Sequence, residues 1–272
     1  MFKENDDMRP ASTPERVLAI CRLIEYGNDS YITQDLYKLC ALNEQAKSTE
    51  EICDSIWAAI ELGFIEKSGD KNKLNSGDKY KLKINGKDLE SPISFRKAVS
   101  SAAFLNREST FFRLTSWYIK HTDEIKWINS FKSFAMAAAK AKDGVSSINE
   151  NGVLGWRFWI RWLGIAYQYK GTLIPNMQTR LEDAFELGKV PRGTRMTCSQ
   201  FVSWLKANVP EAAEACTEQS LPLAISNGLR VLNSEKKIEL ISTMDSVHTS
   251  LSYIDGAELN DFSEIVIMES EA

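Results

Sequence analysis

With 272 residues, of which 43% are hydrophobic and 10% aromatic, the chain can bury the cores of two or three domains. No apolar run approaches the roughly 18 to 20 residues that span a bilayer, and the acidic start 1–7 lacks the basic and apolar regions of a signal peptide, so we expect a cytoplasmic protein without membrane contact. The net charge is -4, and the five cysteines match neither zinc nor disulfide spacing, which argues against a secreted scaffold.

The first third predicts a flexible arm up to about Ser12 and then three helices. The first helix begins at Ser12 or Thr13 with Pro14 in its first turn, and the second is capped by Thr33. Ser48 and Glu51 have the spacing of a capping box for the third. The alternating segments 64–65 and 80–82 then predict a hairpin with a lysine-rich loop.

The middle third follows a short linker at 90–92. Helices are predicted to about residue 105, over 111–120, over 125–142 and over 155–163, and one loop, bracketed by 143–144 and 151–152, precedes the last of these. A hairpin follows, with its turn at Lys170 and Gly171.

The last third predicts helices over 177–187, 201–208 and from Pro222 onward, with Thr197 or Ser199 as the cap of the second. Segments 238–241 and 250–254 are predicted to pair as a hairpin, and 262–267 to add a further strand.

A helix that ends on a short apolar strand and a returning hairpin thus occurs three times. Each copy resembles the last helix and wing of a winged helix-turn-helix. The predicted fold is mainly α-helical with small β-hairpins, as tandem winged helix-turn-helix units: residues 1–90 with the N-terminal arm, a Trp-rich unit at 91–175, and 176–272.

Charge differs sharply between these units. Lys and Arg minus Asp and Glu give -4 for residues 1–90, +7 for 91–175 and -7 for 176–272. The basic middle unit is therefore the predicted polyanion-facing surface, with pairing to the acidic flanks as the alternative.

In the first unit, the third helix presents Glu50, Glu51, Asp54 and Glu61, which would repel a phosphate backbone. The hairpin loop instead carries Lys71, Lys73 and Lys79, which are candidate phosphate contacts. The alternative is that these lysines only keep a strand edge soluble.

In the middle unit, Arg157 and Arg161 are four residues apart and share one helix face. Tyr167, Tyr169 and Lys170 continue this candidate nucleic-acid surface into the hairpin, and arginine with aromatics can contact phosphates and stack on bases. The tryptophans at 156, 159 and 162 have helical spacing, which is also typical of a core.

The sequence contains no glycine-rich phosphate loop and no metal-ligand motif, and its two histidines, His121 and His248, lie in different units. We therefore predict no catalytic activity, no catalytic or metal-binding residues and no cofactor.

Three phrases, at 12–23, 156–164 and 228–232, resemble DpdG, an accessory family of bacterial gene clusters that place 7-deazaguanine derivatives in DNA and restrict DNA lacking them. The resemblance implies antiviral (phage) defence, with other subunits supplying motor and nuclease chemistry. No site residue of this chain is assigned from this resemblance.

The sequence thus predicts a non-catalytic DNA-binding or adaptor subunit of a multi-protein DNA-processing or phage-defence assembly, in which the basic middle unit contacts double-stranded DNA and the acidic units bind other subunits. A protein-interaction scaffold without DNA binding and a transcriptional regulator are the alternatives, and self-association is left open.

Overall fold

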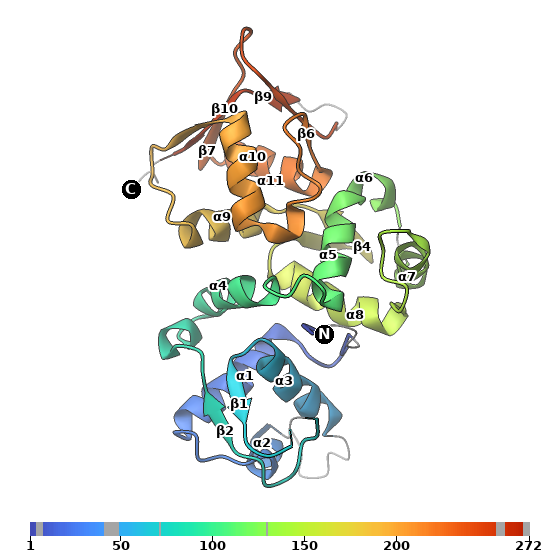
Figure 1. Cartoon of the computed structure of the whole chain (residues 1–272), viewed down its shortest axis with the longest axis vertical. Helices are drawn as coiled ribbons and strands as arrows, with labels where there is room; N and C mark the ends of the chain where they lie inside the picture. Colours follow the sequence, from blue (N-terminus) through green and yellow to red (C-terminus); the bar gives the residue numbers. More distant parts are fainter. Residues whose placement is uncertain (4–7, 41–48, 71, 129, 254–258, 269–272) are drawn as a thin grey trace. The chain divides into compact units, whose positions relative to one another are not determined.

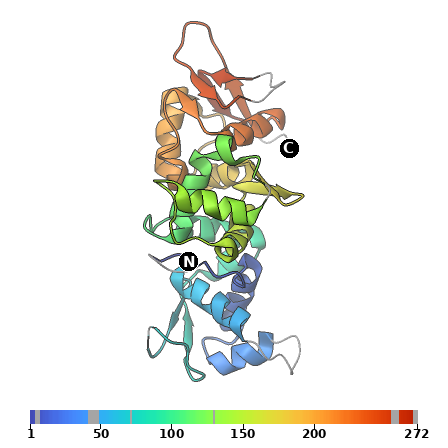
Figure 2. The same ribbon diagram turned by 90° about the vertical axis from the view of Figure 1, so that its right-hand side faces the viewer.

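A computed structural model describes residues 1–3, 8–40, 49–70, 72–128, 130–253 and 259–268. The chain forms two compact units, each discontinuous in sequence (Figures 1 and 2). The first contains Met1–Phe112 and Ile148–Trp162, and the second contains Arg113–Ser147 and Leu163–Ala272. These limits differ from the predicted boundaries near residues 90 and 175, and the three-domain division stays a prediction.

Helices dominate the described residues, and none of them is long and apolar enough to cross a membrane. The helices are α1 (Pro14–Tyr26), α2 (Thr33–Cys40), α3 (Glu50–Glu61), η1 (Gly86–Leu89), α4 (Pro92–Ala103), α5 (Thr110–Lys120), α6 (Thr122–Ile125), α7 (Phe131–Lys140), α8 (Glu150–Trp162), α9 (Gln178–Leu187), α10 (Cys198–Asn208), η2 (Pro210–Ala212) and α11 (Leu223–Ser234).

The strands are short and form small sheets that are antiparallel except for one pair. They are β1 (Ile65–Lys67), β2 (Tyr80–Leu82), β3 (Ala166–Tyr169), β4 (Thr172–Pro175), β5 (Arg195–Thr197), β6 (Ser220–Leu221), β7 (Ile238–Ile241), β8 (Thr249–Leu251), β9 (Asp261–Phe262) and β10 (Glu264–Ile267). β1 pairs with β2 and β3 with β4, and the other sheets have the orders β5-β10-β7 and β6-β8-β9, with β6 parallel to β8.

The predicted N-terminal arm is wrong for the residues described, because this segment packs against the first unit. Phe2 is buried and its ring lies 4.9 Å from that of Phe111 and 5.0 Å from that of Trp159. Farther along, a side chain at Gly155 of α8 would come within 3.1 Å of the Arg9 backbone. The glycine therefore allows the segment to cross α8 closely, and the segment contributes to the core.

The helices of the first unit begin largely where the caps predict. The Thr13 hydroxyl accepts a hydrogen bond from the Arg16 N–H, and α1 buries Val17, Cys21 and Ile24 on one face. Thr33 begins α2, but its hydroxyl bonds the Tyr80 hydroxyl at 2.6 Å. The predicted capping residue Ser48 lies outside the described residues.

From α1 to β2, the first unit has a definite order of elements: a helix, a bridge residue, two helices and two strands. Ile32, between α1 and α2, forms an antiparallel bridge with Lys79, directly before β2. β2 pairs on its other side with β1, so the final strand lies between the other two segments.

The second unit repeats this order. β5 lies between α9 and α10, α11 follows, and then come β7 and β10. β10 pairs with β5 on one side and with β7 on the other, so here too the final strand is central. The prediction that Thr197 caps the helix after β5 is confirmed, since Thr197 and Gln200 form a capping box.

The predicted hairpin between 238–241 and 250–254 is wrong. β7 pairs with β10, whereas β8 pairs with β6 and β9 in a separate sheet. The predicted strand at 262–267 is confirmed in part, as β10. The segment between β7 and β10 therefore forms a small sheet of its own instead of a simple returning strand.

Two predictions in the middle third are also wrong. The helix predicted over 125–142 is shorter: α6 already ends at Ile125, and α7 begins after its cap Ser130 and ends at Lys140. The loop predicted between 143–144 and 151–152 ends earlier than expected, because α8 already begins at Glu150. Gly152 weakens the helical signal in the sequence, but burial of Val153, Trp156 and Trp159 favours the helix.

Candidate nucleic-acid interface

The β1–β2 loop, residues 68–79, is closed at its base by a buried ion pair. Lys67 Nζ lies 3.0 Å from Asp78 Oδ2, and both side chains are nearly inaccessible. Burial alone raises the pKa of Asp78, but the Asn75 N–H and the Lys67 ammonium outweigh this effect and lower it. Asp78 therefore neutralises the charge of Lys67, and this contact joins the end of β1 to the chain just before β2.

The lysines predicted to contact phosphate lie on the outside of this loop. Lys73 and Lys79 are exposed, and no acidic side chain within the described ranges lies at ion-pair distance from either. Lys71 lies outside the described residues. Lys83, by contrast, pairs with Glu66 at 2.8 Å. The ammonium groups of Lys73 and Lys79 are therefore available to an external anion.

The acidic character of α3 is weaker than the sequence predicts. The Glu61 carboxylate is buried, where it accepts a hydrogen bond from the Phe2 N–H and pairs with Arg9 at 3.1 Å. Glu51 pairs with Arg16 at 2.8 Å on the surface. Glu61 is thus neutralised inside the fold and does not face an incoming phosphate.

The two arginines of α8 differ in environment. Arg161 is exposed, whereas Arg157 is half-buried with its guanidinium 4.8 Å from the centre of the Phe158 ring. Burial, and then the nearby Arg161 charge, lower the pKa of Arg157. The neighbouring Trp156 and Trp159 are fully buried, so these tryptophans form core and not a surface for stacking bases.

The β3–β4 hairpin exposes the other predicted residues. Lys170 and Gly171 both have positive φ and form its two-residue turn. Tyr167 and Tyr169 are 46% and 60% exposed, and the Lys170 ammonium lies 5.2 Å from the centre of the Tyr169 ring. The hairpin belongs to the second unit, whereas Arg157 and Arg161 belong to the first.

α11 occupies the place in the second unit that α3 holds in the first, but it is mostly buried. Its Arg230 donates hydrogen bonds to the backbone carbonyls of Leu259 and Ser252. Little of this helix is available to enter a DNA groove, which sets it apart from α3.

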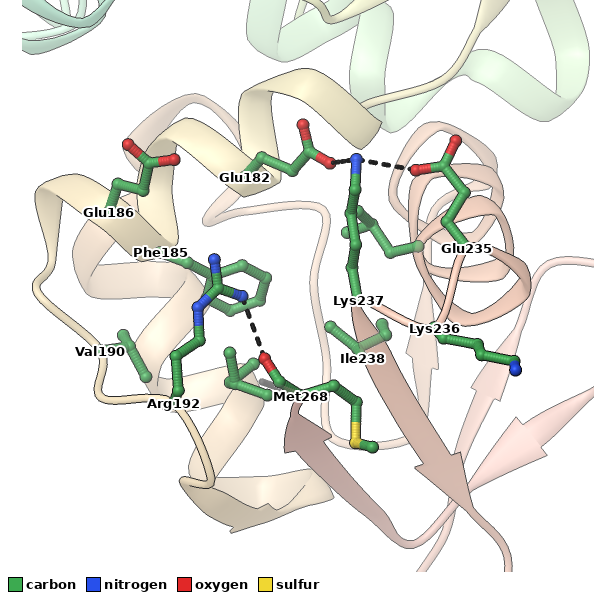
Figure 3. A pocket seen from close by; sticks show the side chains of 12 residues that line it. Glu182, Phe185, Glu186, Val190, Arg192, Glu235, Lys236, Lys237, Ile238 and Met268 are labelled. Carbon is green, nitrogen blue, oxygen red and sulfur yellow. Dashed lines mark hydrogen bonds and ion pairs between the residues drawn. The ribbon is translucent and has the colours of Figure 1, made fainter. Parts of the chain in front are cut away.

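A pocket of about 430 Å³ opens beside α9, the end of α11 and strands β7 and β10 (Figure 3). Its apolar lining includes Phe185 and Ile238, and its rim carries charges of both signs. Lys237 pairs there with both Glu182 and Glu235. The lining as a whole has three basic residues and three acidic ones, so the pocket carries no excess of positive charge; these residues are Arg192, Lys236, Lys237, Glu182, Glu186 and Glu235.

Sequence reasoning missed the lysines of α7. Lys132 and Lys140 are eight residues apart, which is close to two helical turns, and both are exposed. A search for basic residues eight positions apart within a predicted helix would have found them.

His248 has an oxygen acceptor at each ring nitrogen. Nδ1 lies 2.8 Å from Asp261 Oδ1, and Nε2 lies 2.7 Å from the Thr243 carbonyl oxygen. Only the protonated ring donates at both positions. The hydrogen bonds from the ring to Asp261 and Thr243 therefore raise the pKa of His248 above its usual 6.5.

We accordingly expect the His248 ring protons to titrate above pH 6.5 in an NMR pH series, and Asp261→Asn to lower the midpoint. Because the pKa is raised on folding, the contact stabilises the fold fully below the unfolded pKa and is lost as pH rises through the folded one. A wild-type midpoint at or below 6.5 would contradict this.

In comparisons with known proteins, no family model, no curated protein and no solved structure matches this chain.

Proposed function

We propose that the chain is a non-catalytic DNA-binding and adaptor subunit built from winged helix-turn-helix units, acting within a DNA-processing or phage-defence assembly. The observation that carries this proposal is the shared order of the two units. In each unit, one sheet segment lies between the first and second of three helices, and two strands follow the third helix. The last of these strands lies in the middle of the sheet. Such helix-turn-helix modules contact DNA through a helix and an adjoining hairpin.

The DNA contact in this proposal is made to the phosphate backbone. Lys73 and Lys79 are exposed in the β1–β2 loop, and Arg161 and Lys170 add further exposed cations. The acids Glu50 and Glu51 at the start of α3 oppose insertion of that helix into a groove. We therefore propose binding that depends little on base sequence.

The test is duplex binding over a salt series, with the intact chain and two double variants, Lys73→Glu with Lys79→Glu and Arg161→Glu with Lys170→Glu, which change only exposed side chains. Each lost phosphate contact lowers the slope of log K against log salt by about 0.9, so each pair should lower it by about 2. We expect affinity to fall roughly tenfold or more in each double variant.

The matched control is Lys87→Glu with Lys206→Glu, which makes the same change of net charge at two other exposed lysines. This control should lose less affinity than either test variant. Equal losses in all three variants would mean that only overall charge matters, and would contradict the assigned contacts.

A protein-interaction scaffold is the second candidate, favoured by one observation. α11 is mostly buried and its Arg230 donates hydrogen bonds to backbone carbonyls, so the helix of the second unit that corresponds to α3 is not free to enter a groove. Weak duplex binding by the intact chain, independent of salt, would favour this scaffold over the DNA-binding proposal.

A further inference from the structure

The outer face of α7 is basic and lies within the second unit. Lys132, Met136 and Lys140 follow one another at four-residue spacing and are exposed, and we call these three residues the α7 basic face. The rise of 1.5 Å per residue places the two lysines about 12 Å apart along the helix axis. Lys142, directly after the helix, is exposed as well.

Within the described part of the chain, no acidic side chain lies at ion-pair distance from Lys132, Lys140 or Lys142. α7 itself contains no Asp or Glu. The nearest acid in the sequence, Asp143, is engaged elsewhere: its carboxylate lies 2.6 Å from Lys120 Nζ and 3.2 Å from His121 Nε2. The Lys120 ammonium, the first of these contacts in strength, lowers the pKa of Asp143 to about 2.

An exposed tryptophan precedes the helix. Trp127 is 81% exposed, which makes it very different from the buried Trp117 in the same unit. Its ring lies 5.8 Å from the Lys126 ammonium. Five residues of chain join Trp127 to Lys132, so their Cα atoms are at most about 18 Å apart.

The opposite face of α7 is committed to the core. Phe134, Ala135 and Ala138 are buried, and the Phe134 ring lies 5.5 Å from that of Trp117. A helix that lies in a membrane interface must place its apolar face in the lipid. Since that face of α7 is already buried, a lipid surface is a poor fit, and the exposed cations fit a polyanion.

We propose that the α7 basic face and Trp127 form a binding site for single-stranded nucleic acid. Lys132, Lys140 and Lys142 contact successive stretches of the phosphate backbone, and Trp127 stacks on an unpaired base. Exposed aromatic rings beside cationic side chains are the usual means of binding single strands without sequence preference. The site goes beyond the proposed function, because it shares no residue with the β1–β2 loop, α8 or the β3–β4 hairpin.

The experiment measures fluorescence anisotropy of labelled dT15, rU15 and a 15-bp duplex with the full chain over a salt series. Trp127→Ala should weaken binding to dT15 by about 5- to 150-fold, as expected for loss of one stacked base, and leave duplex affinity unchanged. Lys132→Glu with Lys140→Glu should lower the single-strand salt slope by about 1.4. Comparison of dT15 with rU15 distinguishes DNA from RNA as the strand.

Two controls separate this site from the duplex contacts. Lys87→Glu with Lys206→Glu matches the charge change of the α7 double variant, and Lys73→Glu with Lys79→Glu should affect the duplex more than dT15. All substituted side chains are exposed, so circular dichroism should show an unchanged fold.

The inference is overturned if the intact chain does not bind dT15, or if the α7 and Trp127 variants bind it as tightly as the intact chain does. Equal weakening of dT15 and duplex binding by Trp127→Ala would also overturn it, since stacking on an unpaired base is specific to single strands. Binding to phosphatidylserine vesicles, lost in the α7 variants without any dT15 binding, would assign the face to lipid instead. The dT15 measurements do not depend on whether the β1–β2 loop binds a duplex, so a failure of the single-strand site can be told apart from a failure of the proposed duplex contact.

Discussion

Glu211→Ala should destabilise the second unit by about 3–5 kcal/mol, because it removes the carboxylate that neutralises a buried guanidinium. Arg180 Nε, from α9, lies 2.7 Å from Glu211 Oε1 in η2, and both side chains are at most 2% exposed. Arg180 Nη2 lies 3.3 Å from the second carboxylate oxygen. Urea denaturation followed by far-UV circular dichroism measures the loss.

Two further variants test the cause. Lys120→Ala removes an exposed ion pair from the same unit and should cost no more than about 1 kcal/mol. Arg180→Met with Glu211→Met removes both charges and should recover much of the stability lost in Glu211→Ala. A loss below about 1 kcal/mol in Glu211→Ala would show that the guanidinium finds water or another acceptor.

Trp159→Ala should destabilise the first unit by about 3–5 kcal/mol, since it leaves a cavity at a fully buried aromatic position. The Trp159 ring packs against Phe2, and its Nε1–H donates a hydrogen bond to the Ser12 carbonyl oxygen at 2.8 Å. The substitution therefore also loosens the N-terminal segment from α8. Urea denaturation measures the first effect, and amide hydrogen exchange in residues 8–12 measures the second.

The exposed Trp127 provides the matched control. Trp127→Ala removes the same side chain from the surface and should change stability by no more than about 0.5 kcal/mol. Trp159→Phe keeps most of the ring packing but loses the hydrogen bond, so its cost should lie between the two. Equal effects of Trp159→Ala and Trp127→Ala would contradict the place of Trp159 in the core.

The sequence predicts the local elements of the first unit well. Thr13 and Pro14 mark the start of α1, and apolar residues at 3.6-residue spacing mark its buried face. The β1–β2 hairpin follows from alternation and turn residues. These signals lie within a few residues of one another, so they can be read without knowledge of the rest of the fold.

Pairing between distant strands could not be predicted in the same way. β8 follows β7 closely and has a suitable pattern, but β7 pairs with β10. The pairing of β7 with β10 depends on β5. Since β5 pairs with the other edge of β10, β10 lies at the centre of the sheet. Short strands of similar composition carry little information about their partners.

The candidate site shows the same limit. The exposure of Lys73, Lys79 and Tyr169 follows from their place in hairpins. The helical spacing of Trp156 and Trp159 is consistent with a surface face and also with the buried face that the structure shows. Burial of Glu61 was beyond sequence reasoning, because its partner Arg9 lies in a segment predicted to be flexible. Long-range ion pairs of this kind leave no local pattern.

The central position of β10 has a consequence for biosynthesis. While the chain is being made, β5 and β7 emerge first, and both have unpaired edges until residues 264–267 leave the ribosome. A polypeptide that stops before Glu264 would keep two open strand edges, which can pair with those of another chain. Premature termination in this region should therefore yield an aggregating product rather than a shortened, folded one.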